Sequence, residues 1–252
     1  MVTRAEAGSQ PRLPLSRERV LRAAIKIADE SGLESLTMRR LAEDLGAEAM
    51  SLYYHVANKE SLLDGIADAI VAEINEAVDA LDVPSAGDAW KAAVRQRILT
   101  ARTVLLRHRW APRVLETRTS TGTAALLYID GLLRLMRDGG FSYDQIHHAL
   151  HALGSRAVGF AQEMFEPSAG TTADEATAAA LAGLAEQIPH IVGMVMEVAH
   201  DDPDSTLGWC DDQTEFEFGL DIILDGLDRM RAPGASLSPA SRPARKSVAC
   251  QH

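Results

Sequence analysis

The sequence predicts an all-α protein with a small N-terminal helix-turn-helix unit and a larger helical domain behind it. Of the 252 residues, 46% are hydrophobic but only 5% are aromatic, a composition that favours packed helices over sheets. Apolar side chains recur at helical spacing through most of the chain. Near the N-terminus, two short helical patterns are separated by a glycine, as in a helix-turn-helix.

The first helix is predicted from Ser16 to about Gly32. Ser16 can cap its N-terminus, and Glu18 lies favourably near the positive end of the helix dipole. Gly32 can adopt the left-handed conformation that often ends a helix. Residues 1–15 carry proline and glycine without any periodicity, so we expect them to be disordered.

Three further helices complete the N-terminal part. Thr37 can cap the second, Gly46 ends it, and a short third helix covers about residues 49–55. Asn58 can cap a fourth helix that runs to about Leu81.

The rest of the chain is predicted to be helical as well, with a turn at residues 82–87. Pro112, the Gly139–Gly140 pair and Pro203 separate the elements. We expect a loop at residues 166–180, and no strand. The further helices are expected at residues 88–108, 121–138, 143–165, 173–200 and 213–230.

These elements predict five segments. They are a disordered N-terminus (1–15), the helix-turn-helix domain (16–62), a connecting helix (63–82), a second helical domain (83–231) and a disordered tail (232–252).

Charge is distributed unevenly along the chain. The net charge is −11, yet residues 12–60 carry eight basic and eight acidic side chains. The remaining residues carry 17 basic and 28 acidic side chains, which accounts for the whole net charge. The N-terminal part therefore lacks the acidity that would repel a polyanion, although it is no basic patch.

Several classes of protein are disfavoured. The two cysteines, Cys210 and Cys250, have neither the spacing of a zinc site nor the number of a disulfide framework, so a cytoplasmic location fits best. The N-terminus lacks the apolar core of a signal peptide, and no stretch reaches the roughly 18 apolar residues of a membrane span.

The short third helix has the dimensions of a DNA-reading element. It must lie in a major groove about 12 Å wide. Leu52 is expected to face inward, which leaves Ser51, Tyr53 and Tyr54 for phosphate oxygens, base edges or the domain surface. An ordinary three-helix piece of core would show much of this pattern, so spacing alone leaves both interpretations open.

A family resemblance favours DNA binding. The run LTMRRLAEDLGAEAMSLYYHVANKESLLDGIADAI, with its LG, LYYHV and NKESLL motifs, resembles the N-terminal domain of the TetR (tetracycline repressor) family over roughly residues 16–67. The resemblance implies operator contacts near the start of the second helix, on the third helix and at the start of the fourth. These positions are Met38, Arg39, Ala49, Met50, Ser51, Tyr53, His55 and Lys59. The apolar Ala49 and Met50 leave the operator sequence undetermined.

The later part of the chain resembles the C-terminal domain of the tetracycline repressors. The motifs are LLRHR, ETR, GFS and FGLDIILDGLDR. The resemblance implies a homodimer in which the helices at 143–165 and 213–230 pair with their copies. The apolar stripe from Phe216 to Leu227 is compatible with this, although burial within one chain would explain it too.

The resemblance also implies a small-molecule inducer. In tetracycline repressors a histidine just before the ETR-like turn binds the magnesium of the drug chelate. Here that position is Val114 or Leu115, neither of which can bind Mg²⁺. We therefore expect neither metal nor cofactor, and an inducer that is hydrophobic or polyketide-like. The expected pocket residues are Asn75, Arg97, Leu115, Thr117, Arg118 and Glu163.

Two further features admit more than one interpretation. His147, His148 and His151 could ligate a metal, but a solvated or interface cluster is favoured because no cysteine or carboxylate completes a site. Trp110 and Trp209 could line the ligand cavity or fill the core.

The sequence thus predicts a dimeric transcriptional regulator that binds double-stranded operator DNA and is released as a repressor by an inducer. An activator, a ligand-independent regulator and a helical-bundle enzyme using Glu163 and the histidines are alternatives. No phosphate loop or nucleophile elbow supports the enzyme.

Overall fold

The computed structural model describes residues 14–81, 87–118, 121–159, 186–190, 192–193 and 212–231. No strand occurs among these residues, and the all-α prediction is confirmed. Glu163, Trp209, both cysteines, most of the helix expected at 173–200 and the expected tail lie outside them. The domain boundaries drawn from the sequence stay a prediction.

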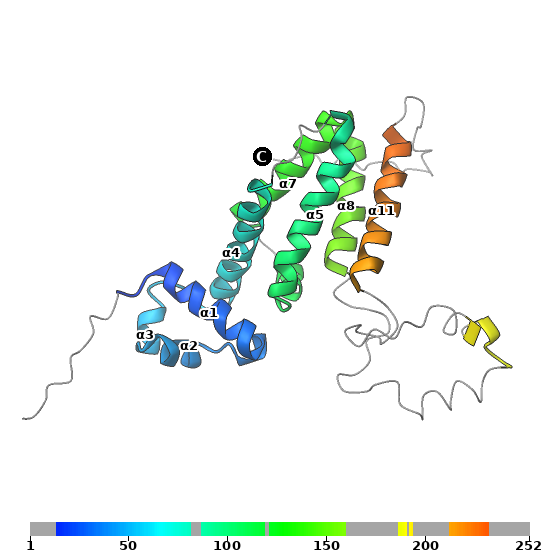
Figure 1. Cartoon of the computed structure of the whole chain (residues 1–252). Helices are drawn as coiled ribbons and strands as arrows, with labels where there is room; N and C mark the ends of the chain where they lie inside the picture. The colour runs from blue at the N-terminus through cyan, green and yellow to red at the C-terminus, as the bar shows by residue number, and fades with distance from the viewer. Residues whose placement is uncertain are drawn as a thin grey trace, which may run out of the picture. The chain divides into compact units, whose positions relative to one another are not determined.

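Contacts divide the chain into two compact units, residues 1–84 with 96–135 and residues 85–95 with 136–252. Each unit is all-helical where it is described (Figure 1). The elements are α1 (Arg17–Ser31), η1 (Leu33–Ser35), α2 (Met38–Leu45), α3 (Ala49–Leu52), α4 (Lys59–Asp79), η2 (Gly87–Ala89), α5 (Trp90–Arg107), α6 (Ala111–Thr117), α7 (Thr123–Asp138), α8 (Tyr143–Gly159) and α11 (Asp212–Arg231).

The predicted helix caps of the first unit are confirmed. Ser16 Oγ accepts from Arg19 N at 3.2 Å, and Thr37 Oγ1 accepts from Arg40 N at 3.1 Å. Asn58 Oδ1 accepts from Ser61 N at 2.8 Å. Each bond satisfies a backbone donor that a helix N-terminus leaves free.

Two elements differ from the sequence prediction. The third helix ends at Leu52 rather than His55, and the chain continues as a turn. Residues 111–117 form α6 although Pro112 was expected to interrupt the chain. A proline within the first helical turn is tolerated, because its missing N–H would have no intrahelical partner there.

The core of the first unit holds α1 to α4 together. Its fully buried members include Val20, Leu36, Leu41 and Leu52, and the same cluster contains Val114 of α6. The short α6 is thereby anchored by burial rather than by its own length, since isolated helices this short are unstable in water.

The second unit contains α8, α11 and the first turns of α5. The rings of Trp90 and Phe141 meet edge to face with centroids 4.6 Å apart, and α8 packs beside α11 (Figure 1). Gln145 Nε2 donates to the carbonyl of Met230 at 2.9 Å, which joins the two helices. None of the described helices is long and apolar enough to cross a membrane.

Candidate functional site

Helices α2 and α3 form a tight helix-turn-helix. Gly46 adopts φ 62° and ψ 34°, the left-handed conformation in which glycine has no steric cost. The N–H of Ala47 then reaches back to the carbonyl of Ala42 at 2.9 Å, which closes the end of α2. Leu52 on α3 is completely buried, so this side chain fixes how α3 lies on the rest of the domain.

Most of the predicted DNA contacts are on the surface of this unit. Met50 is 71% exposed and Tyr53 43% exposed, whereas Met38 packs partly against the core. The Ser51 hydroxyl donates to the carbonyl of Glu48 at 2.6 Å, so it is engaged at the start of α3. The exposed members are Arg39, Ala49, Met50, Tyr53 and Lys59, and the half-buried members are Met38, Ser51 and His55.

Two further side chains near this surface are exposed. Tyr54 is one that the sequence pattern leaves for DNA or the domain surface, and Arg40 is one that it did not single out. Tyr54 is 90% exposed. Arg40 is exposed and donates from Nη2 to the hydroxyl of Ser31 at 2.8 Å. The exposure of Tyr54 agrees with the prediction that Leu52 faces inward.

Arg39 is held by its own helix. Its Nε lies 2.9 Å from Glu43 Oε1, and the two side chains are 90% and 63% exposed. Pairs this exposed are weak, so a DNA phosphate could replace the carboxylate at small cost.

Side chains at both ends of helix α6 bond to residues of α1 and α4. At its N-terminal side, Trp110 Nε1 donates to Asp29 Oδ1 at 2.6 Å, and His108 Nδ1 lies 2.8 Å from the same oxygen. At its C-terminal side, Arg118 Nη1 lies 2.9 Å from Glu60 Oε2 and 3.3 Å from Asp64 Oδ1. Both ends of α6 are therefore tied to helices of the N-terminal domain.

The start of α7 is tied to α4 as well. Asp68 Oδ1 accepts from the backbone N of Ala124 at 3.0 Å, and Asn75 Nδ2 donates to the carbonyl of Ala124 at 2.9 Å. A Cβ on Gly122 would overlap the Asp68 carboxylate, so a side chain there would push this carboxylate away from the Ala124 N–H. Helix α4 thus contacts both the end of α6 and the first turn of α7.

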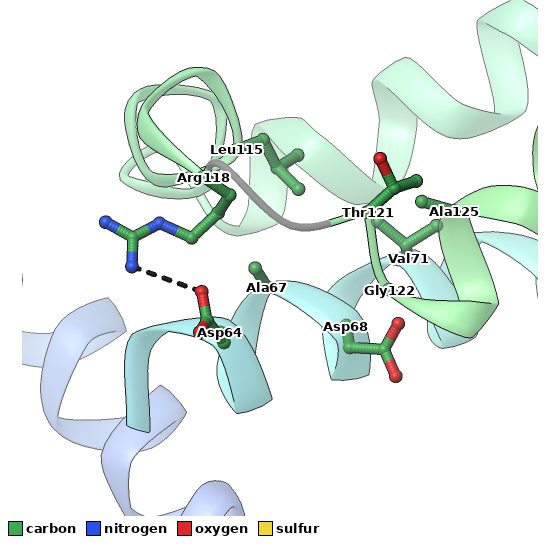
Figure 2. Close-up of a pocket in the computed structure, with 9 residues that line it drawn as sticks. All are labelled: Asp64, Ala67, Asp68, Val71, Leu115, Arg118, Thr121, Gly122 and Ala125. Atoms are coloured by element: carbon green, nitrogen blue, oxygen red, sulfur yellow. Dashed lines mark hydrogen bonds and ion pairs between the residues drawn. The ribbon is translucent and has the colours of Figure 1, made fainter. Parts of the chain in front are cut away.

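A cavity of about 170 Å³ lies between these segments (Figure 2). Its wall combines carboxylates from α4 with apolar side chains and the stem of Arg118. The lining residues are Asp64, Ala67, Asp68, Val71, Leu115, Arg118, Thr121, Gly122 and Ala125.

The predicted pocket residues fall into separate places. Leu115 and Arg118 line the cavity, whereas the Thr117 hydroxyl donates to the carbonyl of Val114 at 2.9 Å within α6. Asn75 and Arg97 contact α7 at Ala124 and Tyr128 and do not line this cavity. Glu163 lies outside the described residues. Val114 is in the core, and Trp110 packs partly against it rather than lining the cavity.

The histidines of α8 are exposed and close together. The rings of His147 and His151 have centroids 4.7 Å apart, and those of His147 and His148 are 5.5 Å apart. Within the described ranges, no group of three histidine, cysteine or acidic side chains could hold a metal ion.

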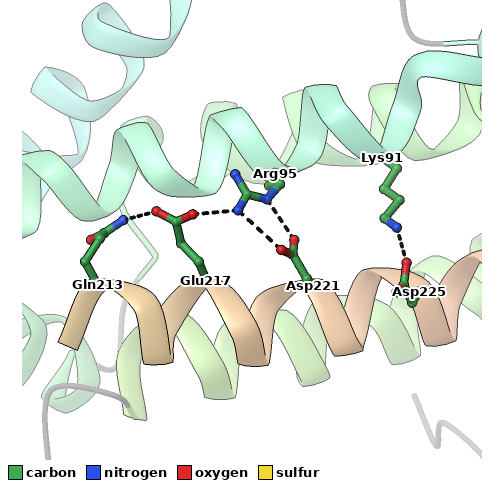
Figure 3. Close-up of polar contacts among 6 residues, drawn as sticks. All are labelled: Lys91, Arg95, Gln213, Glu217, Asp221 and Asp225. Atoms are coloured by element: carbon green, nitrogen blue, oxygen red, sulfur yellow. Dashed lines mark hydrogen bonds and ion pairs between the residues drawn. The ribbon is translucent and has the colours of Figure 1, made fainter. Parts of the chain in front are cut away.

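Charged side chains join α11 to the first turns of α5 (Figure 3). Arg95 Nη2 lies 2.6 Å from Glu217 Oε2, its Nε lies 2.7 Å from Asp221 Oδ1, and Lys91 pairs with Asp225. Hydrogen bonds from Gln213 and Arg95 lower the pKa of Glu217, which keeps this carboxyl ionised.

Another part of the α11 surface is apolar and exposed. Phe218 and Ile222 are 63% and 54% exposed, whereas Phe216, Leu220 and Leu224 are buried. The stripe predicted from the sequence is buried within the chain at Phe216, Leu220, Leu224 and Leu227 and half-buried at Ile223, whereas the exposed Phe218 and Ile222 lie outside it.

Comparison with known proteins matches both parts of the chain. Residues 20–66 match the bacterial regulatory proteins of the tetR family, and residues 83–231 match the tetracyclin repressor-like C-terminal domain. The chain is 31% identical over 218 residues to the tetracycline repressor protein class C of Escherichia coli, which covers 86% of this chain and 92% of that relative. It is 32% identical over 230 residues to the HTH-type transcriptional repressor DrrR1 of Streptomyces coeruleorubidus, covering 89% and 81%.

A solved structure shares the same fold. ActR of Streptomyces coelicolor, in complex with actinorhodin, superimposes with a TM-score of 0.67 and 27% identity, over 88% of this chain and 100% of that one. The helix-turn-helix with its exposed side chains, the helical domain and these similarities lead to one assignment. The chain belongs to the TetR family, and it is a transcriptional regulator rather than an enzyme.

Proposed function

We propose that the protein is a homodimeric repressor that binds operator DNA through α2 and α3 and is released by a small molecule. The observation that carries the proposal is the attachment of α6 to α1 and α4. A ligand that displaces α6 or the start of α7 must act on the ion pairs of Arg118 and the Asp68 cap, and hence on α4. Release follows if the ligand binds the displaced state more tightly than the DNA-bound state.

The proposed operator contacts are the eight residues predicted from the sequence. The exposure of Arg39, Met50, Tyr53 and Lys59 supports their role, because a groove or phosphate can reach them without unfolding. Polar Arg39 and Lys59 would position the domain on the backbone, and Met50 would contact base edges.

The proposed dimer uses α8 and α11. Phe218 and Ile222 present large apolar surfaces to water on α11, which a second copy would cover in a two-fold interface. The Phe218→Asp variant should be monomeric in size-exclusion chromatography with light scattering, and it should lose operator binding. Leu127→Asp on α7, at a similarly exposed position, is the matched control and should remain dimeric. A dimeric Phe218→Asp protein would contradict this interface.

The proposed inducer is not a tetracycline–magnesium chelate. Val114 is buried in the core, and Leu115 offers no ligand atom to a hard cation, so the residues present do not fit the metal. Asn75, Arg97, Leu115, Thr117, Arg118 and Glu163 remain the proposed ligand residues. A large thermal shift with tetracycline that depends on added Mg²⁺ would contradict this proposal.

Fluorescence anisotropy with the DNA upstream of the coding sequence tests the regulator itself. Specific binding should fall steeply with salt, because phosphate contacts release counterions. An unrelated fragment of the same length should bind at least a hundredfold more weakly. Equal binding of both fragments would contradict sequence-specific recognition.

A further inference from the structure

Arg97 is a buried cation that has no counter-ion among the described residues. It lies on α5 and is 7% exposed, and His108, at 9%, is the other charged side chain of the described residues that is buried to this extent. Both ring nitrogens of His108 face carboxylates, at 2.8 Å and 3.3 Å. Arg97, by contrast, has no carboxylate within ion-pair distance in the described part of the chain.

The contacts that Arg97 does make are uncharged. Its Nη2 donates to the backbone carbonyl of Tyr128 at 3.1 Å, and the guanidinium carbon lies 4.6 Å from the centre of the Tyr128 ring. Its Nε is buried without a hydrogen-bond partner among the described residues. Arg118 also has an unpartnered Nε, but its guanidinium is held by Glu60 and Asp64.

Tyr128 does not neutralise Arg97. Burial raises the pKa of Tyr128 to about 12, so its phenol stays protonated and uncharged at neutral pH. Asp79 acts only at a distance from the exposed last turn of α4, and Arg134 opposes it. Desolvation accordingly lowers the pKa of Arg97.

Burying a charge without a counter-ion lowers the stability of the folded state, because the charge loses its water and no opposite charge replaces it. The guanidinium fits at this place because residue 131 of α7 is a glycine. A Cβ at Gly131 would lie 2.6 Å from Arg97 Nη2, so a side chain there would displace the guanidinium from its present position. The site therefore keeps a desolvated cation at a position where an apolar residue would be cheaper.

We infer that Arg97 receives an acidic group of the inducer, so that the ligand is an apolar molecule carrying a carboxylate. A guanidinium presents paired N–H donors that match the two oxygens of a carboxylate, and such a bond is strong where water is excluded. This inference rests on the proposed release by a small molecule, and it adds the charge of that molecule.

The test uses three pairs of probes, each an acid and its methyl ester: 4,5-dihydroxyanthraquinone-2-carboxylic acid, 2-naphthoic acid and decanoic acid. The full-length dimer is bound to its upstream DNA, and release is followed by anisotropy. At least one acid should release the DNA at a concentration at least tenfold below that of its ester. Absence of an acid-over-ester preference in all three pairs overturns the inference.

Three variants assign the preference to Arg97. Arg97→Met should abolish it, Arg97→Lys should retain part of it, and Arg134→Met, which removes an exposed cation on α7, should leave it unchanged. Without ligand, Arg97→Met should bind DNA normally and unfold at the same or a higher temperature, since it removes an uncompensated buried charge. A lower unfolding temperature together with an unchanged acid preference would show a purely structural arginine and overturn the inference.

The two proposals fail in different ways. Release by esters but not by acids would leave the ligand-released regulator standing and overturn only the anionic ligand. A protein that does not recognise its upstream DNA would overturn the regulator itself.

Discussion

The proposed DNA-reading surface on α2 and α3 (Arg39, Ala49, Met50 and Tyr53, called the reading surface below) and the contact between α5 and α11 use charged side chains in opposite ways. On the reading surface, Arg39 is 90% exposed, and among the described residues its ion-pair partner is Glu43 of the same helix. Between α5 and α11, Arg95 bridges two carboxylates of another helix, and the side chains are 32–44% exposed. The first set of charges is available to a partner, whereas the second holds helices together. Mutations in the two regions should therefore separate DNA affinity from stability.

The largest effect is expected where the reading surface depends on the core. Leu52→Ala removes a completely buried side chain and should lower the free energy of unfolding by about 2–5 kcal/mol. Urea denaturation followed by circular dichroism measures this. Tyr54→Ala, two residues later and 90% exposed, is the control and should change stability by less than about 0.5 kcal/mol. Equal effects of the two variants would show that α3 is not anchored by Leu52.

The next effect separates affinity from stability. Arg39→Ala should weaken binding to every DNA sequence by about tenfold, which corresponds to about 1.4 kcal/mol, and should lower the salt dependence by about one unit per contact. Its free energy of unfolding should differ from that of the wild type by less than about 0.5 kcal/mol, because the Arg39–Glu43 pair is exposed. Anisotropy titrations at several salt concentrations measure both. Loss of affinity for only one sequence would assign Arg39 to base reading instead.

Met50→Ala should act on sequence preference rather than on overall affinity. An apolar side chain that is 71% exposed can contact a thymine methyl, and its loss should change discrimination at one position by about 1 kcal/mol. A binding series over single-base operator variants measures this. A uniform loss across the series would place Met50 against the backbone.

The smallest effect concerns pH. The pKa of Glu217 is lowered in the folded state, so its contribution to stability is present above its ordinary value of 4.5 and is lost as the pH falls below that value. Arg95→Met should flatten this dependence, with a change of at most about 1 kcal/mol because the carboxylate is partly solvated. Unfolding midpoints measured at a series of pH values from about 3 to about 7, for the wild type and the variant, test this prediction. DNA affinity at pH 7 should be unaffected.

The parts of the fold that depend on residues close together in the sequence could be predicted. Ser16, Thr37 and Asn58 were identified as caps because a capping side chain bonds to backbone only a few residues away. Gly46 was identified as the turn because glycine adopts the positive φ of a tight turn without steric cost. The predicted DNA contacts remain predictions, although the structure leaves five of the eight exposed.

The elements that depend on distant partners could not be predicted. Helix α6 forms because Val114 packs into a core built by α1 to α4. From the sequence alone, Pro112 indicated a break between elements rather than the first turn of a helix. The bonds of Asp68 and Asn75 to Ala124 join residues about 50 positions apart. No periodicity encodes such a pair.

The sequence by itself determined the helical class, the positions of the caps, the helix-turn-helix and the family resemblance, because these depend on spacing over a few turns. Only the tertiary structure decided that Arg118 and Leu115 share a cavity, that the predicted apolar stripe of α11 is buried while Phe218 and Ile222 beside it are exposed, and that Arg97 is buried with no counter-ion among the described residues. Burial and charge pairing are properties of neighbours in space, and the order of residues along the chain does not state who those neighbours are.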